Sequence, residues 1–274
     1  MSKTLTKQLL RLFEFRHIIS FLMFFSISCL AITNLAYAQI KTGSYTLISG
    51  QPFLKLENGD TLQGTYHVGG IQPDYKLDFD SPEVLDFINQ ARIAAHSKMN
   101  FWQKIASIQE LVIESAFKYR NYSNPFYRGL LKGYRKDRER VPFSQFLKIK
   151  SGVCREYAIA LHIALRAAGI ENEFAYAKIT RDVEMDSGIY KITEDHAFNV
   201  VKYRGQLWMV DSYYGGFNGF LLHDALSLNG LSEHSSKAPI ANTSHIARRI
   251  VSINSYPYIY RPESISSNTS CKSL

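Results

Sequence analysis

The longest regular pattern of apolar residues begins at Cys154, directly after the short segment Ser151-Gly152-Val153. From Cys154, apolar positions recur after four, three, four and three residues, which is the repeat of one face of a helix. These positions are Ala158, Leu161, Leu165 and Ala168. Further apolar residues leave only a narrow polar edge, which is typical of a buried central helix. Gly169 follows where a left-handed residue commonly ends a helix. The pattern therefore predicts a core helix with Cys154 in its first turn.

A cysteine in the first turn of a helix has two possible roles. Unpaired N–H groups and the helix dipole favour negative charge there, so the thiol should ionise more easily. A buried free cysteine is also commonly a small apolar core residue. Because a nucleophilic cysteine needs a base close by, the rest of the chain has to decide between these roles.

Two later segments, 195–203 and 206–211, predict a hairpin around the tight turn Arg204-Gly205. If the last residue of the first strand pairs with the first residue of the second, His196 and Asp211 become diagonal neighbours on one face. Their backbones would then lie about 7 Å apart. A slip of one residue would separate them. Taken singly, His196 could be a strand-end histidine and Asp211 a turn residue. Together they predict a base and the carboxylate that orients it.

The remaining pattern predicts mixed short elements of an α+β protein. The sequence pattern of segment 39–80 predicts short strands, with a hairpin turn at Asn58-Gly59. Helices are expected from Ser81 to about Lys98 and from Asn100 to near Tyr119. The later expectations are a strand at 174–179, a polar loop at 180–194, a possible strand at 217–222, a short helix within 223–233 and a β-like run at 250–253. The expected organisation is a β-rich lead-in (39–80), a catalytic domain (81–222) and a C-terminal extension with a flexible tail (223–274).

The first 38 residues have the order of a secretory signal peptide. A basic region, with Lys3, Lys7, Arg11 and Arg16, precedes an almost wholly apolar run at 18–32. Ala36-Tyr37-Ala38 then supplies a small-x-small cleavage signal before Gln39. We therefore expect export to the periplasm or the medium. An uncleaved anchor is the alternative, and a lipoprotein would use Cys29.

Composition after cleavage narrows the possible classes of function. Removal of residues 1–38 leaves 28 Lys and Arg against 23 Asp and Glu, a net charge of +5, which does not indicate a nucleic-acid-binding protein. Cys154 and Cys271 are too few for a disulfide framework, and we expect Cys154 to be free. His162, His223, His234 and His245 have no metal-ligand spacing, and no glycine-rich phosphate loop occurs. No cofactor is expected.

Segment 127–141 is rich in basic residues and lies just before the cysteine helix. Its basic residues are Arg128, Lys132, Arg135, Lys136, Arg138 and Arg140. Such charge runs are usually solvated loops. The alternative is a basic rim beside the active site that selects an anionic substrate or surface.

Four motifs together resemble the transglutaminase-like superfamily. They are Gly152-Val153-Cys154-Arg155-Glu156-Tyr157-Ala158, Leu165-Arg166-Ala167-Ala168-Gly169-Ile170, His196-Ala197-Phe198-Asn199-Val200 and Trp208-Met209-Val210-Asp211. The resemblance covers about residues 81–220. It implies a papain-like α+β core with the cysteine helix packed on an antiparallel sheet. It also implies Cys154 as nucleophile, His196 as general base and acid, and Asp211 as the orienting carboxylate.

Two departures from the family pattern leave the substrate class open. Phe198 stands where the family commonly has Trp, and Ser212 stands where it usually has Pro. The implied chemistry is acyl transfer through a thioester, with the Cys154 N–H as one oxyanion donor. Our expectation is a cysteine hydrolase acting on a peptide or other amide bond. The alternatives are a protein-glutamine acyltransferase and a non-catalytic binding module of the same fold.

Overall fold

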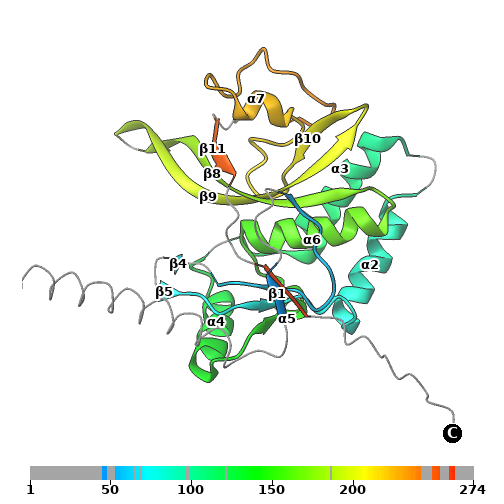
Figure 1. The fold of residues 1–274 in the computed structure, drawn as a ribbon, viewed down its shortest axis with the longest axis vertical. Helices are drawn as coiled ribbons and strands as arrows, with labels where there is room; N and C mark the ends of the chain where they lie inside the picture. The colour runs from blue at the N-terminus through cyan, green and yellow to red at the C-terminus, as the bar shows by residue number, and fades with distance from the viewer. Residues whose placement is uncertain are drawn as a thin grey trace, which may run out of the picture. The chain divides into compact units, whose positions relative to one another are not determined.

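In the computed structural model, helix α6 (Cys154–Ala167) packs against one face of an antiparallel sheet, as expected for this α+β fold (Figure 1). The structure describes residues 45–47, 53–64, 66–67, 70–96, 99–120, 122–185, 187–241, 249–253 and 259–262. Residues Thr46–Pro262 form one compact unit. The predicted signal peptide, Cys29, His245, Cys271 and the predicted flexible tail (266–273) lie outside the described residues.

The main sheet has the strand order β10-β9-β8-β11, and β2 also pairs with β8. The bounds of these strands are β2 (Phe53–Leu54), β8 (Asn172–Met185), β9 (Gly188–Tyr203), β10 (Gln206–Val210) and β11 (Arg249–Ile253). Figure 1 shows α6 on one side of this sheet and the short helix α7 (Leu222–Leu226) on the other. Alternate residues of β9 serve the two sides: Ala197 and Val201 join the core around α6, whereas Phe198 and Val200 join the core beneath α7.

A second sheet is built from strands far apart in the sequence. Its order is β1-β12-β3-β6-β7. The bounds are β1 (Tyr45–Leu47), β3 (Thr61–Leu62), β6 (Tyr75–Lys76), β7 (Val141–Pro142) and β12 (Ile259–Pro262), while β4 (Tyr66–His67) pairs with β5 (Gly70–Ile71). The hairpin predicted around Asn58-Gly59 is therefore wrong, because β2 pairs with β8 and β3 pairs with β6 and β12. Gly59 does occupy a left-handed turn, with φ of 84°, but long-range pairing decides the partners of its flanking strands.

The predicted helices before the cysteine are present. They are α2 (Pro82–Ala94) and α3 (Phe101–Leu111), which continues as a π-helical turn (Val112–Ala116). A further helix, α5 (Phe143–Ile149), was not predicted. Asn100 caps α3 by accepting a hydrogen bond from the Gln103 N–H, and the Gln103 side chain accepts from the Asn100 N–H. The charge-rich segment 127–141 is not a solvated loop, because it contains helix α4 (Pro125–Asp137). Its buried Tyr127 and Leu131, four residues apart, anchor one side of α4 in the core.

Two further predictions need correction. Segment 180–194 is not a polar loop, because it forms the outer part of a long β8–β9 hairpin in which Asn172 pairs with Val201 and Met185 with Gly188. Segment 217–222 forms isolated bridges instead of a strand. The strand predicted at 250–253 is confirmed as β11.

Candidate active site

Cys154 is the first residue of α6, and its approach is fixed by a short parallel pairing. The Tyr119 N–H donates to the Lys150 carbonyl over 3.0 Å, and the Gly152 N–H donates to the Tyr119 carbonyl over 3.1 Å. The chain after the π-helical turn therefore holds the lead-in to the cysteine in place. The thiol is buried, with 5% of Cys154 exposed.

Gly152 is required by close packing beneath the start of α6. A Cβ at this position would lie 2.8 Å from the Glu156 Cβ and 3.1 Å from the Phe117 ring. Real side chains do not tolerate the first of these distances without movement. This explains physically why glycine stands two residues before Cys154.

Glu156 organises the N-terminus of α6. Its Oε2 accepts a hydrogen bond of 2.7 Å from the Val153 N–H, which precedes the helix. The next N–H, that of Cys154, belongs to the first turn and has no acceptor within the helix. It is thus suited to hydrogen-bond an oxyanion formed beside the thiol.

The buried Glu156 carboxylate is compensated by Arg155. The Arg155 Nε lies 3.5 Å from Glu156 Oε1, and its Nη2 donates to Gln72 Oε1 over 2.6 Å. The guanidinium carbon also lies 3.8 Å from the centroid of the Tyr75 ring. These contacts join β6 and the segment before it to the cysteine helix. The network was not predicted from the sequence, because nothing local to either segment indicates the pairing.

His196 and Asp211 meet as the predicted hairpin register requires. β10 pairs with β9 from Gln206 opposite Tyr203 to Val210 opposite Asn199, which confirms the register. His196 Nε2 lies 2.8 Å from Asp211 Oδ2. His196 is 0% exposed and Asp211 is 2% exposed. Because a carboxylate only accepts, Nε2 carries the proton of this hydrogen bond.

The second oxygen of Asp211 is held by the turn that follows. Asp211 Oδ1 accepts hydrogen bonds from the backbone N–H groups of Tyr213 (2.8 Å) and Tyr214 (3.3 Å). Hydrogen-bond donors therefore hold both carboxylate oxygens in a fixed orientation. The residues after Asp211, including Ser212 in place of the family's proline, therefore form a turn around the carboxylate.

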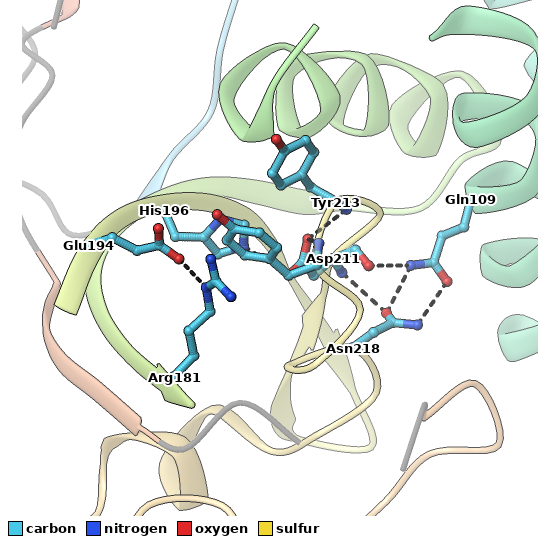
Figure 2. A network of polar contacts seen from close by, with 8 residues as sticks. Gln109, Arg181, Glu194, His196, Asp211, Tyr213 and Asn218 are labelled. Atoms are coloured by element: carbon cyan, nitrogen blue, oxygen red, sulfur yellow. Dashed lines mark hydrogen bonds and ion pairs between the residues drawn. The ribbon is translucent and has the colours of Figure 1, made fainter. Parts of the chain in front are cut away.

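A pair of buried amides positions the backbone of Asp211 (Figure 2). Asn218 Oδ1 accepts from the Asp211 N–H over 3.2 Å, and Gln109 Nε2 donates to Asn218 Oδ1 over 2.8 Å and to the Asp211 carbonyl over 3.3 Å. Neither amide was predicted from the sequence. A detectable signal existed for Gln109, which is a polar residue between Ile108 and Val112 on the apolar side of its helix.

The electrostatics of the site favour a protonated His196. Burial disfavours the charged imidazole, but Asp211 and the Cys154 thiol outweigh this and raise the pKa of His196 to about 10. The other ring nitrogen, Nδ1, is buried and makes no hydrogen bond to a described residue. Although Nδ1 has no partner of strict hydrogen-bond geometry, the Cys154 thiol is close enough to raise the pKa of the ring, so the two groups lie side by side. The structure thus brings Cys154, His196 and Asp211 together.

Aromatic side chains enclose His196 and connect it to the outer hairpin. The Tyr214 ring lies 4.7 Å from the imidazole, and the Phe198 ring lies 6.1 Å from it. The Arg181 guanidinium lies 4.7 Å from the Tyr214 ring and forms an ion pair with Glu194 (Figure 2). The β8–β9 hairpin, which the sequence pattern predicted as a loop here, therefore supports the ring that covers His196.

The other sequence candidates lie away from this site or act structurally. His162 is buried in α6, where its Nδ1 lies 2.8 Å from Asn172 Oδ1. The described residues contain no cluster of three or more His, Cys, Asp or Glu that could hold a metal ion. Among those residues, no helix has the length and apolar character needed to cross a membrane.

Comparison with known proteins identifies the family of the central segment. A search of curated proteins finds no match. One similar solved structure is described as a candidate cysteine protease from Cytophaga hutchinsonii, with 10% identity and a TM-score of 0.30, covering 64% of this chain and 68% of that one. Residues 91–211 match the family model of the transglutaminase-like superfamily, a match that includes Cys154 and His196 and ends at Asp211. This segment of the chain therefore belongs to the transglutaminase-like superfamily.

Proposed function

We propose that this protein is a cysteine hydrolase that cleaves a peptide or other amide bond through a thioester. Cys154 is the nucleophile, His196 the general acid and base, and Asp211 the group that orients the imidazole. The proposal rests chiefly on the buried 2.8 Å contact between His196 and Asp211 next to the thiol of Cys154. All three groups are present, which counts against a binding module that has lost its chemistry.

In the first step, the Cys154 thiolate attacks the carbonyl carbon of the substrate, and a C–S bond forms. The oxyanion accepts a hydrogen bond from the Cys154 N–H. As the C–N bond breaks, His196 gives its Nδ1 proton to the leaving amine. Asp211 keeps its hydrogen bond to Nε2 throughout and stabilises the imidazolium before the proton leaves.

In the second step, the neutral imidazole takes a proton from water, whose oxygen attacks the thioester carbon. The C–S bond breaks, which releases the acid and restores the thiolate beside the imidazolium. An amine in place of water would give a new amide by the same proton transfers. That outcome is the protein-glutamine acyltransferase alternative, and it differs only in the group that resolves the thioester.

Acylation by an activated ester tests this proposal with a generic acyl donor in place of the natural substrate. Incubation with p-nitrophenyl acetate should release nitrophenol and leave one acetyl group on Cys154, detectable by intact mass and peptide mapping. Cys154→Ser should abolish this adduct, and His196→Ala should reduce its rate at least a hundredfold. Adding a primary amine then separates the products, because acetate marks hydrolysis and an acetylated amine marks transfer. Equal ester turnover by wild type and Cys154→Ser would reject the proposed nucleophile.

We also propose that the protein is exported through residues 1–38, on the sequence pattern given above. N-terminal sequencing of protein recovered outside the cytoplasm should find Gln39 as the first residue. Recovery of the intact N-terminus only inside the cell would reject export.

A further inference from the structure

Helix α4 has an exposed basic side that the proposed chemistry does not use. Arg128, Lys132 and Lys136 are each separated by four residues, so they follow one line along the helix. All three are exposed, and none forms an ion pair with a described residue. Their opposite side is anchored by Tyr127 and Leu131 in the core. Because this anchoring fixes the orientation of the helix, the three charges form a cationic row that stays exposed to solvent.

A second line of residues runs directly beside this cationic row. It consists of Phe126, Gly129 and Gly133, spaced by three and four residues, and it meets the row at Lys136. Phe126 is 60% exposed, and a Cβ on either glycine would meet no atom within 4 Å. Glycine weakens a helix interior relative to alanine, so the fold itself gains nothing from either one. Their effect is a flat strip between the cationic row and an exposed aromatic ring.

Tyr119 extends the aromatic end of this face toward the cysteine. It is 37% exposed, and its ring lies 6.2 Å from that of Phe126. The Lys118 Nζ lies 5.8 Å from the Tyr119 ring, which adds a further cation. Because the Tyr119 carbonyl accepts from the Gly152 N–H, this aromatic end borders the lead-in to Cys154.

We propose that this face of α4, together with Tyr119 and Phe126, docks onto the surface of an anionic lipid bilayer. A row of cations beside exposed aromatic rings is the combination that an anionic membrane interface binds, because the cations meet headgroups and the rings enter the acyl boundary. A soluble polyanion would use the cations but gain little from Phe126. Docking would bring the Cys154 lead-in close to the membrane surface. It does not depend on whether Cys154 is a nucleophile.

Vesicle flotation with matched charge variants tests this docking. The full chain is mixed with vesicles of phosphatidylglycerol and phosphatidylcholine, or of phosphatidylcholine alone, at low and high salt. One variant removes the row on α4 by Arg128→Gln, Lys132→Gln and Lys136→Gln. The control removes the same charge elsewhere by Lys178→Gln, Lys191→Gln and Lys202→Gln, three exposed residues of the β8–β9 hairpin. The basic and apolar N-terminal segment is the same in every protein, so differences between them report on the changed residues.

We expect wild type to prefer the anionic vesicles and high salt to weaken that preference. Each charge near the surface contributes about a fivefold effect, so the α4 variant should lose about a hundredfold in binding. The hairpin control should lose far less, and Phe126→Ser should weaken vesicle binding without weakening binding to soluble polyglutamate. The proposal is overturned if wild type shows no preference or if both triple variants lose equally. It is also overturned, in favour of a polyanion site, if Phe126→Ser binds vesicles as wild type does.

Discussion

His196 Nε2 lies 2.8 Å from Asp211 Oδ2, with both side chains almost fully removed from solvent. This contact couples protonation of the imidazole to folding. Asp211 and the Cys154 thiol raise the pKa of His196 from 6.5 to about 10 against the opposing effect of burial. The folded protein therefore holds a proton on His196 that the unfolded chain releases near pH 6.5.

The first prediction concerns stability at alkaline pH. The contribution from His196 is fully present below pH 6.5 and is lost as pH rises toward about 10. The free energy of unfolding should fall with a slope approaching about 1.4 kcal/mol per pH unit across that window. Denaturant titrations of wild type and Asp211→Asn measure it, since the variant lacks the charge that raises this pKa and should show a flatter profile. An equally steep profile in the variant would contradict the assignment.

We expect the buried His162 to give the opposite pH dependence of stability, at acidic pH. Burial, assisted by Arg166 and Lys55, lowers its pKa to about 4, despite the raising effect of its hydrogen bonds to Asn172 and Leu56. Because the folded state holds His162 neutral, its contribution is present above pH 6.5 and is lost as pH falls toward about 4. His162→Gln should flatten the acid limb of the same stability curve. An unchanged acid limb would show that other groups control it.

Asn218 should act as a positioning residue. Asn218→Leu leaves the Asp211 N–H and the Gln109 amide buried without their partner, so it should cost about 1–3 kcal/mol of stability. It should also slow thiol labelling at neutral pH by disturbing Asp211. The matched control is Asn229→Leu at an exposed position, which should change neither property. Loss of stability with an unchanged pH profile of labelling would indicate a purely structural role.

Gly152 and Gly133 give a paired test of backbone packing. Gly152→Ala places a Cβ 2.8 Å from that of Glu156, so it should destabilise the protein by about 1–3 kcal/mol. Gly133→Ala meets no atom within 4 Å in helix α4 and should instead stabilise it by about 0.5–1 kcal/mol. Thermal unfolding of both variants measures the difference. Similar shifts of the same sign would contradict this account of the cysteine lead-in.

The parts of the site that follow from local pattern were predictable from sequence. Apolar spacing predicted the cysteine helix, and a two-residue turn fixed the register that places His196 near Asp211. The outer β8–β9 hairpin was not predicted, because its two-stranded part carries polar residues on exposed surfaces. Apolar and polar residues therefore alternate only weakly along the sequence there. Helix α4 was not predicted because its many charged residues make its apolar side difficult to recognise in the sequence. That side consists mainly of Tyr127 and Leu131.

The remaining features depend on contacts between distant segments. Gln109 and Asn218 are 109 residues apart, and nothing near either amide indicates the other. Arg155 likewise contacts two distant residues, because it donates a hydrogen bond to Gln72 and lies over the ring of Tyr75 in the second sheet. The strands beside Asn58-Gly59 show the same limit, because a correct turn signal did not determine which strands pair.

The most direct test of the central claim is the pH dependence of Cys154 alkylation by iodoacetamide in wild type and His196→Ala. An imidazolium beside the thiol should keep labelling fast at mildly acidic pH. The variant should lose this acid-side reactivity while retaining a folded core, checked by circular dichroism. Labelling of wild type that rises only near the ordinary thiol range, and is unchanged in His196→Ala, would contradict a working Cys154–His196 pair.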